Sequence, residues 1–454
     1  MTFKKFFYLL TITTILLLNG NSGYSQEKPD KSNSKDESKL IILTGATIID
    51  GVSDKAIKDG TIIIKGDTIT DTFYGKTDKI AHFPENALVI DLKGHYIIPG
   101  LIDGHVHISH ESRAQTEEDL RCALLGGVTS VRDMAGDMRR LASLKRDAKL
   151  NEIVSPNIYY SALVSGPSFF NDPRVADVSR GEGVGEVPWA RKVTEASNIP
   201  QIIAEGKGTG ATGIKLYANM EPGLIKRIVE EVHKQGLKAW SHLAVFPSMA
   251  SDSIDAGMDG VSHSPMFYFQ SMENPPQTYL DSKKIKVDSS VLETQSEMYK
   301  KLFSRMVEKN IILDATVFVY YYSAEKPTCE EKEKGKWEIM KQNYEFAIKA
   351  TAAAYMSGVK ISAGTDYMVE SGDAFPNIHK EIELLVLQCG LTPIDAIRAA
   401  TYNNAQVMGI NAKTGSIEKG KMADLVILTA DPLIKIENTR SIQMVIKEGR
   451  IFQR

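Results

Sequence analysis

Two histidines, His105 and His107, are separated by a single residue in the segment IDGHVHI. The apolar residues around them indicate a β-strand, in which residues i and i+2 point to the same face. Two imidazoles side by side at a strand end form a chelating pair for a divalent metal ion. The pair alone is weak evidence for a metal site, because this spacing also occurs by chance.

Four more residues of metal-site type lie in strand-like segments further along the chain. His242 stands near the end of KAWSHLA, His263 near the end of GVSHS, and Asp366 ends KISAGTD, while Lys215 lies inside the apolar run GIKLYA. Taken singly, the histidines could be core residues, the aspartate a helix cap and the lysine an ion-paired strand residue. A lysine aimed into a barrel is costly unless it is neutral, paired or modified. Together the six residues favour a metal centre.

The segments that must position these residues form a regular series. Residues 100–406 alternate apolar strand-like runs with amphipathic helical stretches, such as 224–235 and 344–356. The strand-like runs are GLIDGHVHI, VTSVRDM, NIYYSAL, GIKLYA, KAWSHLA, GVSHS, ILDATVFV and VKISAGTD. Eight such units predict an α/β fold, a (β/α)8 TIM barrel, whose active site lies at the carboxyl ends of the strands. A doubly wound open sheet is the weaker alternative.

Both ends of this region are rich in β-type sequence. Short β pieces such as KLIILTGATIID precede it, and ADLVIL and QMVIKEGRIF follow it, the last with an expected hairpin at Glu448 and Gly449. We therefore expect one small discontinuous β-sandwich domain, built from residues 40–98 and 412–454 around a barrel at 99–411.

The first 25 residues have the features of a secretory signal peptide. Lys4 and Lys5 precede an apolar run that is too short to span a bilayer, and Gly23 and Ser25 stand at the −3 and −1 positions of a cleavage site. An uncleaved membrane anchor is the alternative. The polar segment 26–39 is expected to be a flexible linker. The mature protein should then be periplasmic or secreted, with no membrane attachment after cleavage.

The composition excludes several classes of protein. The chain has 454 residues, a formal net charge of −3, 43% hydrophobic and 24% charged residues. These values exclude a mainly disordered chain and a multi-span membrane protein, and they argue against a nucleic-acid binder. The three cysteines are an odd number, and the chain is too long for a disulfide scaffold. The expected partner is a small-molecule substrate, and a homo-oligomer is left open.

These motifs resemble the amidohydrolase superfamily. The resemblance is carried by HVH after PGLIDG, a lysine on the fourth strand, single histidines ending the fifth and sixth, and GTD on the eighth. The segments LTPIDAIRAATYNNA and GSIEKGKMADLVILTADPL are similar to the end of the family's barrel and to its small β-sandwich. The resemblance extends from about Leu40 to Gln453. It is greatest to the branch of imidazolonepropionase-like enzymes and prolidase-like (Xaa-Pro) dipeptidases.

The resemblance implies two divalent metal ions, with zinc favoured and manganese, cobalt or iron tolerated. His105, His107 and Asp366 would bind the more buried ion. His242 and His263 would bind the more exposed one.

The remaining residue of the set, Lys215, would be carboxylated by CO2 and bridge both ions. The resemblance further implies a metal-bridging hydroxide as nucleophile. Asp366 would accept the proton of the water and pass it to the leaving nitrogen. Imidazolonepropionase is similar but lacks the lysine, so Lys215 favours the two-metal, dipeptidase-like side.

The substrate contacts carry over less well. Prolidase-like relatives often have a Tyr two residues after the strand-five histidine, where this chain has Ala244, and the loop Ser165–Arg174 lacks their histidine. Tyr217, two residues after the bridging lysine, and Tyr320 are candidates for an apolar part of the substrate. Arg174 is a candidate for a carboxylate.

The function expected is that of a secreted metal-dependent amidohydrolase. It would cleave an amide-type C–N bond in a dipeptide, an N-acyl amino acid or a cyclic amide. A lactone or ester hydrolase using the same site is one alternative. A non-catalytic binding protein on the same fold is the other, since a fold does not fix a function.

Overall fold

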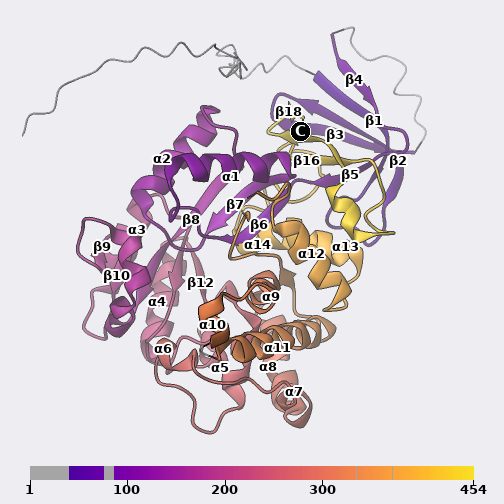
Figure 1. Ribbon diagram of the computed structural model, residues 1–454. Helices are drawn as coiled ribbons and strands as arrows, with labels where there is room; N and C mark the ends of the chain where they lie inside the picture. Colours follow the sequence, from indigo (N-terminus) through magenta and orange to yellow (C-terminus); the bar gives the residue numbers. More distant parts are fainter. Residues whose placement is uncertain (1–39, 76–85, 334, 371, 454) are drawn as a thin grey trace, which may run out of the picture. The chain divides into compact units, whose positions relative to one another are not determined.

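A computed structural model describes residues 40–75, 86–333, 335–370 and 372–453 (Figure 1). The expected signal peptide and linker at 1–39 lie outside these residues. Strands and helices alternate through the middle of the chain, and a second sheet is formed from its two ends. Within the described ranges, no helix has the length and hydropathy needed to cross a membrane.

Eight parallel strands form the barrel, each paired with the next along the sequence. They are β6 (Leu101–Val106), β7 (Val128–Asp133), β8 (Asn157–Ser165), β11 (Gly213–Leu216), β12 (Lys238–His242), β13 (Gly260–Ser262), β14 (Ile312–Asp314) and β15 (Ile361–Ser362). Every residue of β6, β7 and β11 is buried, as is typical of parallel strands covered on both faces.

The first and last strands meet through two backbone hydrogen bonds. The N–H of Gly104 donates to the carbonyl of Ala363 at 3.0 Å, and the N–H of Asp366 donates to the carbonyl of His105 at 2.7 Å. The predicted barrel is thereby confirmed, because a doubly wound sheet would leave these two strands apart as open edges. One predicted strand was too long: ILDATVFV is extended only over Ile312–Asp314, and a helix begins at Val317.

Helices cover the outside of the barrel (Figure 1). The helix α4 buries Leu224, Ile225, Ile228, Val229 and Val232, a stripe with the spacing of one helix face. The covering helices are α1 (Arg113–Leu125), α2 (Met138–Leu150), α3 (Ile199–Gly208), α4 (Pro222–Lys234), α5 (Ala250–Ala256), α8 (Ser296–Glu308), α11 (Lys336–Met356), α12 (Ile378–Leu387), α13 (Pro393–Arg398) and α14 (Asn404–Val407). The helical stretch expected at 224–235 is present as α4, which ends one residue earlier, and the stretch expected at 344–356 lies within α11.

Shorter elements follow the carboxyl ends of the strands, where they can shape a site. They are η2 (Pro167–Asn171), η3 (Pro173–Ser179), β9 (Glu186–Val187), β10 (Ala190–Lys192), η4 (Ser264–Ser271), α6 (Tyr279–Ser282), α7 (Val291–Thr294), α9 (Val317–Glu325) and α10 (Cys329–Glu333). The turns η5 (Ala399–Asn403) and η6 (Ile436–Arg440) flank the return to the second sheet.

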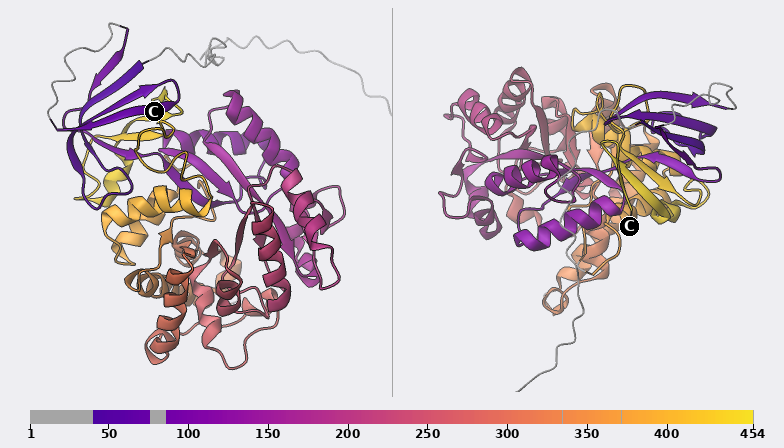
Figure 2. Two further views of the ribbon diagram at one scale, coloured as in Figure 1. Left: turned by 180° about the vertical axis from the view of Figure 1, so that it is seen from behind. Right: turned by 90° about the horizontal axis from the view of Figure 1, so that it is seen from above.

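The second sheet joins the two ends of the chain, so that indigo and yellow strands lie side by side (Figure 2). Its order is β18–β17–β16–β5–β1–β2–β3, with β4 paired to β1. The bounds are β1 (Leu40–Ile48), β2 (Ile57–Lys65), β3 (Thr68–Tyr74), β4 (Leu88–Asp91), β5 (Tyr96–Pro99), β16 (Leu425–Leu428), β17 (Ile442–Lys447) and β18 (Arg450–Phe452). The small domain from both ends is confirmed, while its boundaries at 98 and 412 stay predictions.

The expected hairpin near the end of the chain is also present. Glu448 and Gly449 form the two-residue turn between β17 and β18, with φ of 48° and 72°. Positive φ at both positions is the conformation of a type I′ turn, which explains the glycine.

Candidate metal centre

The six predicted metal-site residues lie at the carboxyl ends of five barrel strands. They are His105 and His107 on and just after β6, Lys215 on β11, His242 at the end of β12, His263 just after β13, and Asp366 after β15. Barrel enzymes build their active sites at this end of the strands. The exposed fraction of His105, Lys215 and His242 is 1% or less. The side chains of His107 and Asp366, by contrast, are 21% and 23% exposed, so one side of the site is open to solvent.

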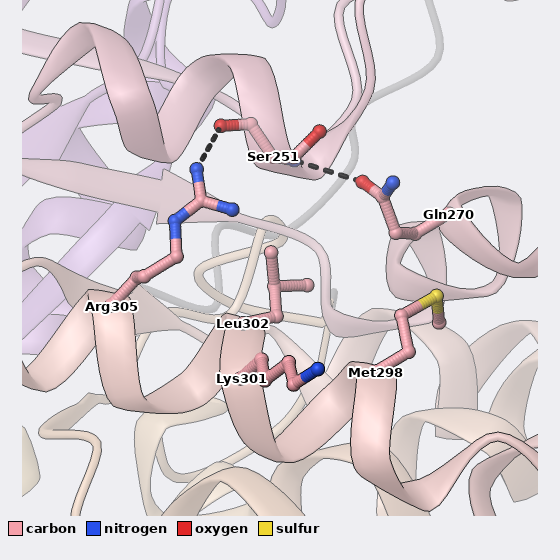
Figure 3. A pocket seen from close by; sticks show the side chains of 6 residues that line it. All are labelled: Ser251, Gln270, Met298, Lys301, Leu302 and Arg305. Atoms are coloured by element: carbon pink, nitrogen blue, oxygen red, sulfur yellow. Dashed lines mark hydrogen bonds between the residues drawn. The ribbon is translucent and has the colours of Figure 1, made fainter.

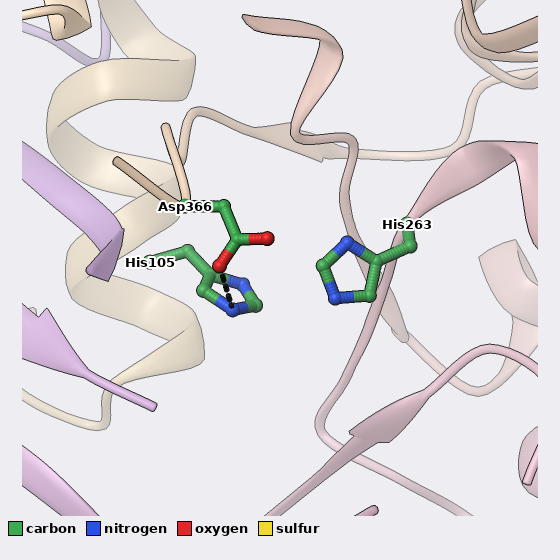
Figure 4. Close-up of side chains that lie close together, drawn as sticks. All are labelled: His105, His263 and Asp366. Atoms are coloured by element: carbon green, nitrogen blue, oxygen red, sulfur yellow. Dashed lines mark ion pairs between the residues drawn. The ribbon is translucent and has the colours of Figure 1, made fainter. Parts of the chain in front are cut away.

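Three of these residues form a group with the spacing of metal ligands. One ligand atom each from His105, His263 and Asp366 lies within 4.8 Å of the other two (Figure 4). The oxygen Oδ1 of Asp366 is 3.4 Å from Nε2 of His105 and 3.2 Å from Nε2 of His107. Two ligand atoms bound to one tetrahedral zinc ion lie about 3.4 Å apart. The spacing therefore fits a shared ion.

The two rings of the HVH motif are fixed through their Nδ1 atoms. Nδ1 of His105 lies 2.7 Å from Oδ2 of Asp314, and Nδ1 of His107 lies 3.2 Å from the carbonyl of Ala135. A ring that donates from Nδ1 keeps Nε2 as its lone-pair nitrogen. Partners of this kind commonly orient metal-binding histidines.

Each of the other two histidines also has one ring nitrogen that is available to bind a metal ion. Nδ1 of His263 lies 2.9 Å from Oγ1 of Thr316, which leaves Nε2 available. Nδ1 of His242 is buried and has no hydrogen-bond partner among the described residues. The His242 ring centroid is 4.8 Å from that of His263. A buried nitrogen with no partner is costly in a protein interior, and binding a metal ion would satisfy it.

Lys215 has no exposed surface and donates from Nζ to Oγ of Ser262 at 3.1 Å. The Ser262 hydroxyl in turn donates to Oδ2 of Asp314 at 2.9 Å. Burial lowers the pKa of Lys215 to about 7, with the carboxylate of Asp314 opposing this shift. A substantial fraction of the lysine is therefore the neutral amine at neutral pH, the form that reacts with CO2.

Metal binding requires neutral imidazoles and an ionised carboxylate. Burial lowers the pKa of His107, but the carboxylate of Asp366 outweighs it and raises this pKa. The pKa shifts of His242, His263 and Asp366 suit metal binding. Burial lowers the pKa of His263 to about 3 and that of His242 well below its usual range. Burial raises the pKa of Asp366, but His105 and His107 outweigh it and hold this pKa well below its usual range.

Two buried aspartates support the site and were not among the predicted residues. Asp314, at the end of β14, accepts from His105 and from Ser262. Asp103, on β6, accepts from the N–H of His105 at 3.2 Å and from the N–H and hydroxyl of Thr365 at 3.1 and 2.7 Å. Their only sequence signal was an acidic residue in an otherwise apolar strand.

Two of the predicted substrate contacts, Tyr217 and Tyr320, lie near the candidate ligands, and their role stays a prediction. The Tyr217 ring lies 4.0 Å from the ring of His242, and the Tyr320 ring lies 6.4 Å from that of His263, measured between centroids. The structure adds Phe169 and Tyr279, whose rings lie 4.5 and 5.9 Å from that of Tyr217. The side chain of Arg174 is outside the described part of the structure, so its role stays a prediction.

A cavity of about 340 Å³ lies elsewhere, between α5, η4 and α8 (Figure 3). It is lined by Ser251, Gln270, Met298, Lys301, Leu302 and Arg305. Arg305 donates to the carbonyl of Ser251 at 3.3 Å, and the N–H of Ser251 donates to Gln270 at 2.9 Å. None of the predicted metal-site residues lines it.

Comparison with known proteins agrees with this geometry. The sequence model of the amidohydrolase family matches residues 96–452 of this chain. The chain belongs to the amidohydrolase family. The expectation of an enzyme that hydrolyses carbon–nitrogen bonds is thereby confirmed.

This amidohydrolase is similar over most of its length to two curated relatives. Ochratoxinase from Aspergillus niger is 24% identical, over 94% of this chain and 90% of the relative. Imidazolonepropionase from Flavobacterium johnsoniae is 23% identical, over 82% of this chain and 85% of the relative.

Solved structures show the same fold as this amidohydrolase. A Xaa-Pro dipeptidase with bound methionine aligns with a TM-score of 0.70 at 22% identity, over 92% of this chain and all of the other. The structure of the A. niger ochratoxinase aligns with a TM-score of 0.70 at 22% identity, over 92% and 96% of the two chains.

Proposed function

We propose that this amidohydrolase is a secreted, two-metal hydrolase of an amide-type C–N bond in a dipeptide, an N-acyl amino acid or a cyclic amide. The observation that carries the proposal is the meeting of His105, His263 and Asp366, with ligand atoms within 4.8 Å, at the carboxyl ends of the barrel strands. The proposed periplasmic or extracellular location rests on the signal-peptide pattern of residues 1–25.

The residues divide into two sets of ligands. His105, His107 and Asp366 would hold one divalent ion, with zinc favoured, and His242 and His263 would hold the other. Lys215 would bridge them as a carbamate formed with CO2. When bound, such ions activate water and polarise a carbonyl. The buried Nδ1 of His242, with no partner among the described residues, supports the second set.

The chain itself supplies the proton transfer. Asp366 is ionised at neutral pH, because its pKa is held well below its usual range despite burial. It can accept the proton of the attacking water and deliver it to the leaving nitrogen. Tyr217 and Tyr320 lie beside the histidines and would contact the substrate.

The test is amine release from a mixed library of dipeptides and N-acyl amino acids. The protein is loaded with zinc in bicarbonate, and Asp366→Asn serves as the blank. If the wild type releases amine and the Asp366→Asn blank does not, the proposal is supported. Whether the dipeptides or the N-acyl amino acids are cleaved then shows which side of the bond is recognised.

The same protein also tests the alternatives. A folded protein with two bound ions that releases no amine is assayed for acid release from lactones and esters. Activity there would replace the amide proposal with a lactone or ester hydrolase. Inactivity on every pool would favour a binding protein.

A further inference from the structure

A buried glutamate on α12 lies outside the proposed ligand set, and burial raises its pKa well above the usual range, against the effect of the two backbone N–H groups that donate to it. Glu381 has no exposed surface, and its two oxygens accept the N–H groups of Val317 at 3.2 Å and Phe318 at 2.6 Å. These are the first two residues of α9, whose N–H groups have no acceptor within the helix. Glu381 therefore fixes where α9 begins.

The residue just before α9 has a strained backbone. Thr316 has φ of 50° and ψ of 43°, in the left-handed region. A β-branched residue rarely adopts this conformation, and strain of this kind persists only where the surrounding structure imposes it. Glu381 binds the two N–H groups that follow Thr316, so it is placed to impose this conformation.

Thr316 in turn determines which nitrogen of His263 carries the proton. Its hydroxyl donates to the carbonyl of Ala315 at 2.8 Å, so it accepts from Nδ1 of His263 at 2.9 Å. The proton of the neutral ring is then on Nδ1, and Nε2 has the free lone pair. Rotation of Thr316 would remove the group that fixes this tautomer.

We propose that Glu381 is a positioning residue for the metal ligand His263, acting through the backbone of Thr316. The proposal rests on the two-metal site of the proposed function. It links a residue on the outer helix α12 to the ion held by His242 and His263.

The test measures zinc affinity, which needs no substrate. Glu381→Leu removes both acceptor oxygens, whereas Glu381→Gln keeps one. We expect Glu381→Leu to weaken the binding of one of the two zinc ions by about 10- to 100-fold, the usual effect of losing an outer partner of a ligand. The other ion should bind as in the wild type, and Glu381→Gln should show a smaller loss. Competition with a chelator gives both constants.

Thr316→Val tests the route of this effect. It removes the hydroxyl but leaves Glu381 in place, so it should weaken the same ion. If Glu381 acts through Thr316, the double variant should lose no more affinity than the larger single loss, whereas independent effects would add. The visible spectrum of the cobalt-loaded protein should change in the same variants.

Glu383→Gln is the matched control. Glu383 is a nearly buried carboxylate on the same helix, paired with Arg440 and Lys380 rather than with α9. It should leave both zinc affinities unchanged. If Glu381→Leu does not fold, Glu381→Gln replaces it in the comparison of the two single variants with the double variant.

Two results would overturn the proposal: folded Glu381 variants with wild-type affinity for both ions, or additive losses in the cycle. Failure of the proposed function would look different, because the wild type itself would then bind fewer than two ions.

Discussion

Oδ2 of Asp314 lies 2.7 Å from Nδ1 of His105, and the same oxygen accepts from Ser262 at 2.9 Å. Arg132, with 1% exposure, lies 3.4 Å from it. One carboxylate oxygen thus orients a proposed ligand and, through the Ser262 hydroxyl, the amine of Lys215. The positions of these two ligands depend on each other.

Replacing Asp314 by Asn should weaken metal binding and activity by about 10- to 100-fold. The reason is that Nδ1 of His105 loses its hydrogen bond to a carboxylate. It also leaves the charge of Arg132 buried without its partner. Bound zinc and amine release are measured together on the purified variant. Asp147→Asn, on the outer helix α2, is the control and should behave as the wild type. Unchanged zinc affinity in the Asp314 variant would show that this carboxylate does not orient the ligand.

Replacing Lys215 by Met should reduce the bound zinc from two ions to one, because the bridging group is removed while the side-chain volume is largely kept. Elemental analysis after dialysis measures this. In the wild type, growth in labelled bicarbonate should give a carbamate carbon signal that the variant lacks. Retention of two ions by the variant would show that Lys215 is not the bridge.

The stability of the metal-free protein should increase with pH. The pKa of Lys215 is lowered by burial from 10.5 to about 7 in the folded chain. Between these values the unfolded chain holds a proton that the folded chain lacks, so raising the pH favours folding. The gain in stability from Lys215 begins as the pH rises through about 7, its pKa in the folded chain. It is complete above 10.5, its pKa in the unfolded chain.

The measurement is the melting temperature in chelator from pH 7.5 to 9.5. We expect a steeper rise for the wild type than for Lys215→Met, which has no such group. Parallel curves for the two proteins would contradict the lowered pKa.

Replacing Tyr217 by Ala should lower kcat/KM by about tenfold without changing the bound zinc. The ring packs against His242 and Phe169, so its loss removes apolar contact area beside the site. Tyr217→Phe keeps the ring and serves as the control, which should retain most of the activity. A loss of zinc from Tyr217→Ala would instead show that the ring holds His242 in place.

The barrel could be predicted from the sequence, and so could the position of the candidate ligands at one end of it, for a physical reason. The barrel strands are apolar runs, and charged or imidazole side chains are rare inside such runs unless they have a function. His242, His263 and Asp366 were therefore conspicuous. Since parallel strands end at the same side of a barrel, their meeting followed from the fold.

The supporting residues could not be predicted in the same way. Glu381 lies on a helix, where an acidic residue usually faces solvent, and its partner Val317 is far away in the sequence. The end of β14 was also misjudged, because the residues of ILDATVFV favour a strand throughout. The positive φ of Thr316 interrupts the extended chain, and a β-branched residue has no local preference for this conformation.

The hydrogen bonds of Gly104 and Asp366 that close the barrel also join the first ligand segment of the chain to the last. A nascent chain can therefore hold His105 and His107 long before Asp366 is synthesised, yet it cannot complete the site until β15 has docked against β6. Capture of the proposed ions would then be a late step of folding. A bound ion would hold together the two strands that are farthest apart in the sequence, and it would slow the unfolding that begins by separating them.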